Sequence, residues 1–225
     1  MPRARHNQNI RQTAAANEYE GSGCLPVFIL PPLIVLFVGL LLAFFAANIP
    51  AQATTLQMAN AELAPFFTPE VDYWAAAISR WANASNLDPN LVAVIMQIES
   101  CGNPSARSSA GAMGLFQVMP FHFFITDNPY DPDTNAARGL AYLKRALNAA
   151  KNDVRLALAG YNGGIGVITS VELNWPAETV RYVYYGSGIY EDARAGQPRS
   201  SRLDEWYSRY GAGLCNQARQ YQTAR

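Results

Sequence analysis

An uncharged apolar segment from Leu25 to Pro50 constrains this 225-residue chain more than any other feature. A membrane-spanning helix needs roughly 17–25 apolar residues, and the segment is long enough even when counted from after Pro31-Pro32. The alternative is a buried core helix, but the segment is apolar on every side. The sequence therefore predicts a transmembrane helix at 25–50, after a polar, disordered tail at 1–24.

The flanking cations predict the orientation of this span. Arg3, Arg5 and Arg11 precede it, whereas the first cation after it is Arg80. The positive-inside rule therefore keeps the tail in the cytoplasm and exports the rest, as in a single-pass protein of the cell membrane. The alternative is secretion after cleavage near Ala53, because the preceding residues resemble the small-residue site of a signal peptide.

Composition excludes several classes of function. The chain has 17 cationic and 17 anionic side chains, so nucleic acid is not an expected partner. Two histidines and three cysteines without close spacing predict no metal, and we expect no organic cofactor. Cys101 and Cys215 both follow the span and can form a disulfide if they are exported; otherwise they are small buried hydrophobic residues.

After a linker at 51–67, helix caps and apolar periodicity predict an all-α, or nearly all-α, domain. Thr68-Pro69 is expected to begin one helix and Asp88-Pro89 the next. Further helices are expected at about 113–119, from Asp133 with Leu140, Leu143 and Leu147 as its apolar stripe, from Asn152 to Tyr161, from Pro176 to about Tyr185, and at about 201–219. No segment alternates as a strand would.

Glu99 is the residue whose position is most suggestive of chemistry. It falls in the last turn of a mostly apolar helix, before a loop rich in Gly, Ser, Asn and Pro. The helix dipole and partial burial both oppose ionisation there, which raises a carboxyl pKa as a general acid requires. The alternative is an ordinary helix end with a solvated glutamate.

The stretch ESCGNPSARSSAGAMGLFQVMP, from Glu99 to Pro120, resembles the signature of the soluble lytic transglycosylase (SLT) domain, a branch of the lysozyme-like superfamily. The later segments beginning at Tyr130, Leu158 and Pro176 resemble the family's Y-D-P, A-Y-N-A-G and E-T-x-x-Y-V segments. The likeness covers about 71–185. It implies a lysozyme-like helical domain at 68–190, followed by a C-terminal helical extension at 191–225.

The resemblance also implies a reaction and a set of roles. The family cleaves the β-1,4 bond between N-acetylmuramic acid and N-acetylglucosamine in peptidoglycan and forms a 1,6-anhydro sugar. Glu99 would act as the catalytic acid and base, with Tyr161 hydrogen-bonded near it. The substrate-binding residues would be Ser108, Gln117, Met119, Asn135, Tyr161, Asn162, Glu178 and Tyr182.

The sequence departs from the family after Pro120, where Phe121-His122-Phe123-Phe124 follows and the stretch before Tyr130 is short. These changes predict that one end of the cleft differs in shape from that of the family. His122 is expected to be a loop or core residue rather than a second catalytic group.

Two other functions remain open. A goose-type lysozyme-like hydrolase would need a second carboxylate, and the sequence offers no obvious one near Glu99. A non-catalytic peptidoglycan-binding subunit, or a scaffold, would not need Glu99. The expected partners are peptidoglycan glycan strands, the membrane, and a secretion or conjugation apparatus.

Overall fold

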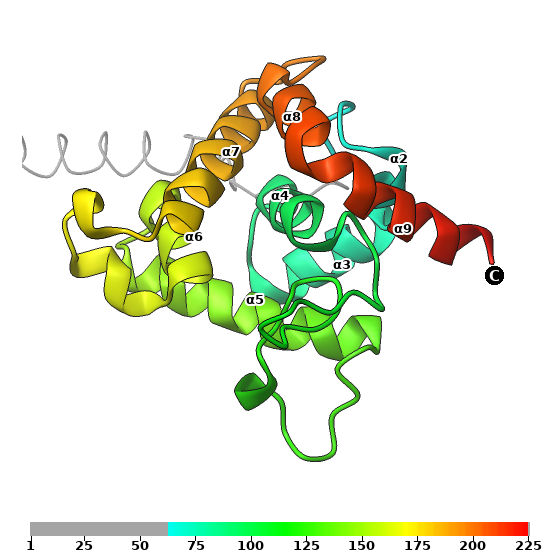
Figure 1. Cartoon of the computed structure of the whole chain (residues 1–225), viewed down its shortest axis with the longest axis horizontal. Helices are drawn as coiled ribbons and strands as arrows, with labels where there is room; N and C mark the ends of the chain where they lie inside the picture. The colour runs from blue at the N-terminus through cyan, green and yellow to red at the C-terminus, as the bar shows by residue number, and fades with distance from the viewer. Residues whose placement is uncertain (1–62, 225) are drawn as a thin grey trace, which may run out of the picture. The chain divides into compact units, whose positions relative to one another are not determined.

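The computed structural model describes residues 63–224, and this part of the chain is helical without β-strands (Figure 1). The α-helices are α2 (Pro69–Asp72), α3 (Ala75–Ser85), α4 (Pro89–Ser100), α5 (Pro132–Ala149), α6 (Val154–Gly163), α7 (Ala177–Arg194), α8 (Ser201–Trp206) and α9 (Ala212–Thr223). The 3₁₀ helices are η1 (Pro120–His122), η2 (Ile165–Thr169) and η3 (Glu172–Asn174), and η4 (Tyr207–Gly211) is a π-helical turn. The prediction of an all-α domain is confirmed.

The predicted tail at 1–24, the span at 25–50 and most of the linker lie outside the described residues. Between residues 63 and 224, none of the helices combines the length and the apolar character that crossing a membrane requires.

Helix α4 lies at the centre of the domain and carries Glu99 near its end. It contacts α2, α3, α7 and α9, which surround it in Figure 1. Every side chain from Leu91 to Met96 is at most 2% exposed, so this helix is buried on all sides. Its start is fixed as predicted, because the Asp88 carboxylate accepts a hydrogen bond from the Asn90 N–H at 2.8 Å.

The helix predicted from Thr68 is two helices. Pro69 begins α2, but a turn at Tyr73-Trp74 separates it from α3. Trp74 explains the break, because its indole Nε1–H donates to the Gly102 carbonyl at 2.9 Å. Thr68 does not cap with its side chain; its hydroxyl donates to Gln97 Oε1 at 3.1 Å.

The helix predicted at 113–119 is wrong. Met113 instead forms isolated antiparallel bridges with Arg107 and Val118. Gly114 and Gln117 have φ of +78° and +45°, which a right-handed helix does not allow. The apolar spacing that suggested a helix is that of a tight, buried loop.

Other predicted boundaries move by small amounts, with one larger exception. Asp131, not Asp133, caps α5 by accepting from the Thr134 N–H at 2.9 Å. The cap of α6 is Asp153, so that helix begins at Val154, two residues after Asn152. Helix α7 continues to Arg194, nine residues beyond the predicted end, because it also packs against α8.

Both ends of the described range pack on the domain. Leu63 and Phe67, at the end of the predicted linker, are each 7% exposed and belong to the core. Leu203, Trp206 and Cys215, in the predicted extension, are also buried there. The segment after residue 190 is therefore part of the same hydrophobic core.

Candidate active site

The end of α4 is built to hold Glu99 in place. Ser100 is buried, and its hydroxyl donates to the Leu115 carbonyl at 2.7 Å and accepts from the Gly102 N–H at 3.2 Å. Cys101 then ends the helix in the left-handed conformation, with φ of +50°. One serine thus joins the last turn of the helix to the loop that follows it.

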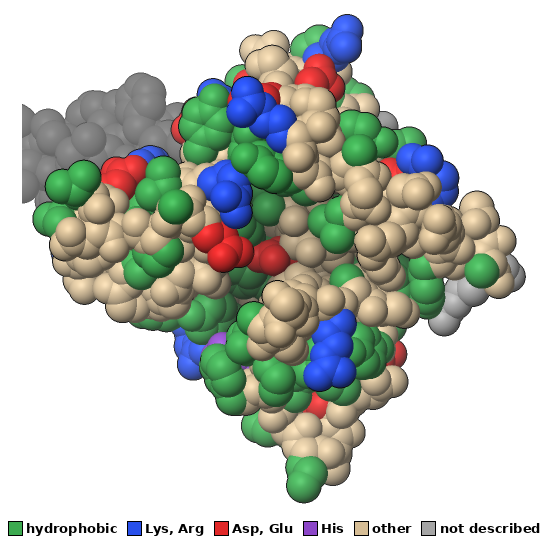
Figure 2. Space-filling view, in the orientation of Figure 1, with side chains coloured by type: hydrophobic (Ala, Val, Ile, Leu, Met, Phe, Trp, Pro, Cys, Tyr) green, Lys and Arg blue, Asp and Glu red, His purple; other side chains and the backbone are tan. Residues whose placement is uncertain are grey.

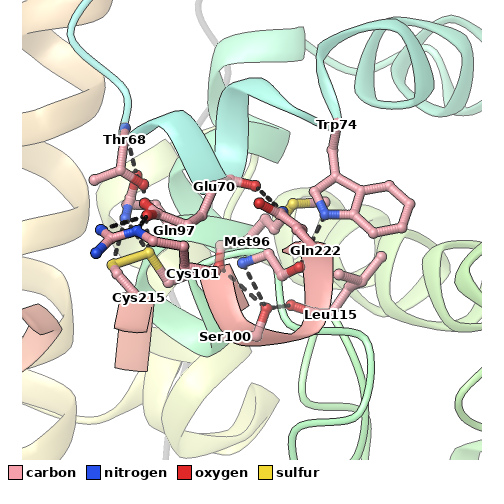
Figure 3. The surroundings of a disulfide bond; sticks show 12 residues. Thr68, Glu70, Trp74, Met96, Gln97, Ser100, Cys101, Leu115, Cys215 and Gln222 are labelled. Carbon is pink, nitrogen blue, oxygen red and sulfur yellow. Dashed lines mark hydrogen bonds and ion pairs between the residues drawn. A yellow bond between two sulfur atoms is a disulfide. The ribbon is translucent and has the colours of Figure 1, made fainter. Parts of the chain in front are cut away.

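A disulfide between Cys101 and Cys215 ties this helix end to α9 (Figure 3). Gln97 lies beside the sulfur atoms, and its Nε2 is 3.1 Å from the Cys101 sulfur. On the same side, the buried Glu70 carboxylate accepts from Arg219 of α9 at 2.8 Å. A covalent bond and an ion pair therefore hold the C-terminal helix against the domain, and the covalent bond is made only two residues after Glu99.

Glu70, Cys101 and Cys215 are the described residues whose ligand atoms lie close enough together to hold a metal ion. Both sulfurs are used by the disulfide, and the carboxylate is paired with Arg219. The group as built is therefore a structural contact rather than a metal centre.

Asn135 positions the loop at 113–119. It is 1% exposed, its Oδ1 accepts from the Phe116 N–H at 2.8 Å, and its Nδ2 donates to the carbonyls of Met113 and Pro129 at 2.8 and 2.9 Å. A Cβ at Gly114 would collide with this amide. Asn135 was predicted to bind substrate; the structure gives it a buried, fully bonded place instead.

Glu99 lines a pocket of about 180 Å³ formed by helices far apart in the sequence. Figure 2 shows acidic and basic side chains together at a hollow in the middle of one face. The pocket is lined by Ile98, Glu99, Asn162, Glu178, Arg181, Tyr182, Tyr185, Trp206 and Tyr210.

The environment of Glu99 favours its protonated form. Burial raises the pKa of Glu99 from 4.5 to about 8, and the negative charge of Glu178 adds to the rise. The Tyr182 hydroxyl acts in the opposite direction, because its O–H favours the carboxylate. That hydroxyl is buried, and no hydrogen bond to another described residue satisfies it.

A second pocket, of about 310 Å³, shares Asn162 with the first. Its lining residues are Gln117, Val118, Met119, Phe121, His122, Gly139, Tyr142, Tyr161, Asn162, Gly163 and Gly164. His122 packs against the Tyr142 ring, with 4.7 Å between the ring centroids. Phe121 and His122 belong to the stretch after Pro120 that differs from the family, so this stretch forms one wall of the second pocket. Burial lowers the pKa of His122, and the positive charge of Arg145 lowers it further.

Tyr161 lines the second pocket and is close enough to Glu99 to be affected by its charge. Its hydroxyl donates to the Phe116 carbonyl at 2.8 Å rather than to Glu99. Burial raises its pKa well above 10, and the charge of Glu99 adds to this, so the group stays a neutral phenol close to the acid. The predicted hydrogen bond near Glu99 is thus made to the backbone of the loop.

The structure brings most of the predicted site residues to these two pockets. The first is lined by Glu99, Glu178 and Tyr182, and the second by Gln117, Met119 and Tyr161. Asn162 lines both. Ser108 and Asn135 line neither. The Ser108 hydroxyl closes a turn by accepting from the Ala112 N–H at 3.0 Å.

Sequence reasoning missed Arg181, Tyr185, Trp206 and Tyr210 in the Glu99 pocket. Trp206 and Tyr210 lie beyond the segment that carries the resemblance, so no motif pointed to them. Arg181 and Tyr185 had a signal: on one helix they follow Glu178 by three and seven residues, on the same face.

Sequence comparison with known proteins matches the part of the chain that contains Glu99 to one family model. The model of the transglycosylase SLT domain matches residues 76–178. The chain is 40% identical to a transglycosylase of Enterobacteria phage PRD1, over 48% of this chain and 40% of that protein. It is 31% identical to a membrane-bound lytic murein transglycosylase C of Photorhabdus laumondii, over 38% of this chain and 29% of that protein.

A third relative is a soluble lytic murein transglycosylase of Salmonella typhimurium, 31% identical over 39% of this chain and 16% of that protein. This chain therefore spans less than half the length of each of these relatives. The segment that the family model matches contains Glu99. Residues 76–178 are thus similar to the transglycosylase SLT domain.

Proposed function

We propose that this protein is a peptidoglycan lytic transglycosylase that cleaves the β-1,4 bond between N-acetylmuramic acid and N-acetylglucosamine. The observation that carries the proposal is the carboxyl of Glu99, which lines a pocket and has its pKa raised to about 8. The family match and the names of the relatives support the choice of substrate.

In the first step Glu99 is the general acid. With a pKa of about 8, the carboxyl is mostly protonated at neutral pH and can give its proton to the glycosidic oxygen as the bond to C1 breaks. The positive charge that develops at C1 is then next to the new carboxylate, which stabilises it.

In the second step the same carboxylate is the base. It accepts the proton of the muramic acid C6 hydroxyl while that oxygen bonds to C1, and Glu99 returns to its protonated form. The product is a 1,6-anhydro sugar, and no water is consumed. The Tyr182 hydroxyl supports the first half of the cycle, in which Glu99 gives up its proton, because it favours the charged form of Glu99.

A second candidate is a hydrolase of the goose lysozyme type, and one observation favours it. The sequence offered no obvious second carboxylate, but Glu178 lines the same pocket as Glu99. An inverting glycosidase uses a second carboxylate to activate water. Glu178 supplies that group, so the two reactions differ in product rather than in the residues available.

The test is the mass of the products. Full-length protein in detergent is incubated with purified peptidoglycan, beside Glu99→Gln and beside Glu191→Gln, an exposed carboxyl of α7 outside the pocket. Anhydro-muropeptides from wild type and Glu191→Gln, and none from Glu99→Gln, are expected. Products 18 Da heavier would assign the hydrolase, and equal release by Glu99→Gln would remove Glu99 from the mechanism.

We further propose that the apolar segment at 25–50 anchors the domain outside the cytoplasm, as a single-pass membrane protein beside a secretion or conjugation apparatus. The name of one relative described above, the transglycosylase C of Photorhabdus laumondii, includes the word membrane-bound. Fractionation of cells with a C-terminal tag tests the anchor. If the tagged protein appears in the soluble extracytoplasmic fraction with a new N-terminus near Ala53, the protein is secreted after cleavage and not anchored.

A further inference from the structure

Among the described residues that line the two pockets, Arg181 is the only lysine or arginine. It lies on α7, one turn after Glu178, in the same pocket as Glu99. Basic and acidic side chains lie side by side at the hollow in Figure 2. A cation here is not explained by the chemistry of sugar rings, which are uncharged.

The guanidinium of Arg181 makes no ion pair with a described carboxylate. By contrast, Arg138, Arg155 and Arg202 are paired with Asp127, Glu172 and Glu205. Glu178 lies one turn away on the same helix, yet no ion pair joins it to Arg181 within the described part of the chain. The charge of Arg181 is therefore available to a ligand in the pocket.

An aromatic ring fixes the position of this charge. The Arg181 Cζ lies 5.2 Å from the centroid of the Tyr210 ring, and Tyr210 packs edge-on against Tyr185. Stacking on a ring covers one face of a guanidinium and leaves its N–H edges free, in the planar fork that matches a carboxylate.

We infer that Arg181 is a specificity-determining residue that binds a carboxylate carried by the muramic acid residue of the glycan strand. This inference rests on the proposed function and names the part of the substrate that the site recognises. Two sources supply that chemistry: the free lactyl carboxylate of a peptide-free muramic acid, and the carboxylates of a stem peptide attached to it.

The test is a binding measurement on the full-length Glu99→Gln protein, which holds substrate without cleaving it. Three ligands of equal length are compared: peptide-bearing muroglycan, peptide-free muroglycan and a chitin oligosaccharide, which has no carboxylate. The substitution Arg181→Ala, introduced into the Glu99→Gln protein, should weaken binding of at least one muroglycan about tenfold, because a charged hydrogen bond is lost. Binding of the chitin oligosaccharide should be unchanged.

The pattern of loss identifies the source of the carboxylate. Weakening only with the peptide-free strand assigns the lactyl carboxylate, because the peptide-bearing strand carries that group as an uncharged amide. Weakening only with the peptide-bearing strand assigns the stem peptide, and weakening with both shows that Arg181 binds whichever carboxylate the muramic acid residue carries. Arg181→Lys should recover part of the affinity, because the charge remains without the fork. Raising the salt concentration should reduce the wild-type advantage.

Arg155→Ala is the matched control. Arg155 also lies over an aromatic ring, that of Trp175, but it is paired with Glu172 and lines neither pocket. Equal weakening of all three ligands by Arg181→Ala, or no weakening of any, would overturn the inference and leave the proposed function intact. Failure of Glu99→Gln to bind any muroglycan would instead count against the proposed function.

Discussion

The two pockets that meet at Asn162 are constructed differently. The Glu99 pocket is lined mainly by residues of α4, α7 and the C-terminal helices, whereas the second pocket takes one wall from the loop at 117–122. The helical pocket is held by a disulfide and a hydrophobic core, and the loop pocket by the amide of one residue, Asn135. The acid that needs a fixed environment lies on rigid helices, and the wall that departs from the family lies on a loop.

The largest expected difference between the pockets is in rate. Glu99→Gln should lower kcat about 10³-fold, within the range for loss of a general acid, because an amide cannot donate the proton. Gln117→Ala should lower it less than about tenfold, because the loop pocket only holds substrate. Initial rates of muropeptide release measure both, and comparable losses would show that the loop takes part in the chemistry.

Removing the disulfide tests the support of the helical pocket. Cys101→Ala with Cys215→Ala should lower the free energy of unfolding by about 2–5 kcal/mol, since the bond closes a loop with a sequence separation of 114 residues. Denaturant titration of the variant, beside wild type with and without reductant, measures the loss. If reductant changes wild type but not the variant, the bond is responsible; equal stability throughout would contradict its role.

Asn135→Ala tests the support of the loop pocket. The change leaves the Phe116 N–H and the Met113 and Pro129 carbonyls without their partner, and should cost about 2–4 kcal/mol. Asn148→Ala, on the exposed side of the same helix, should change stability by less than about 0.5 kcal/mol. A stable Asn135→Ala protein would mean that the loop is held by other contacts.

The smallest expected effect is on the pH profile. A general acid with a pKa of about 8 loses its proton as pH rises through 8, so kcat/KM should fall on the alkaline side near that value. Glu178 raises this pKa by its negative charge, so Glu178→Gln should move the alkaline limb to lower pH, by about half a unit or less. Movement to higher pH would contradict the sign of this interaction. Gln117→Ala should leave the limb in place.

The sequence predicted best what depends on neighbouring residues. Asp88 caps α4 and Pro69 begins α2 because capping and proline geometry are local properties. It failed at 113–119, where the backbone is set by Asn135, about twenty residues away, and by positive φ at Gly114 and Gln117. Apolar spacing alone cannot separate a buried loop from a short helix.

The site shows the same division. The motifs located Glu99 and three residues that line its pocket, which are Asn162, Glu178 and Tyr182, because all four fall within the segments that carry the resemblance. Trp206 reaches the pocket only because α8 packs on α7, and Tyr210 only because its ring packs against Tyr185. Their spacing in sequence gives no sign of either contact. Ser108 matched the motif but closes a turn, since a motif records residues kept for the fold as well as for the ligand.

The bond between Cys101 and Cys215 also has a consequence for the timing of biosynthesis. Cys215 comes after every residue of the segment 76–178, so the helix that carries Glu99 cannot be locked until the later chain has been made and has met an oxidant. A newly made chain in a reducing cytoplasm lacks that lock. With the export proposed above, full maturation of the acid's surroundings is delayed until the protein has left the compartment in which it was synthesised.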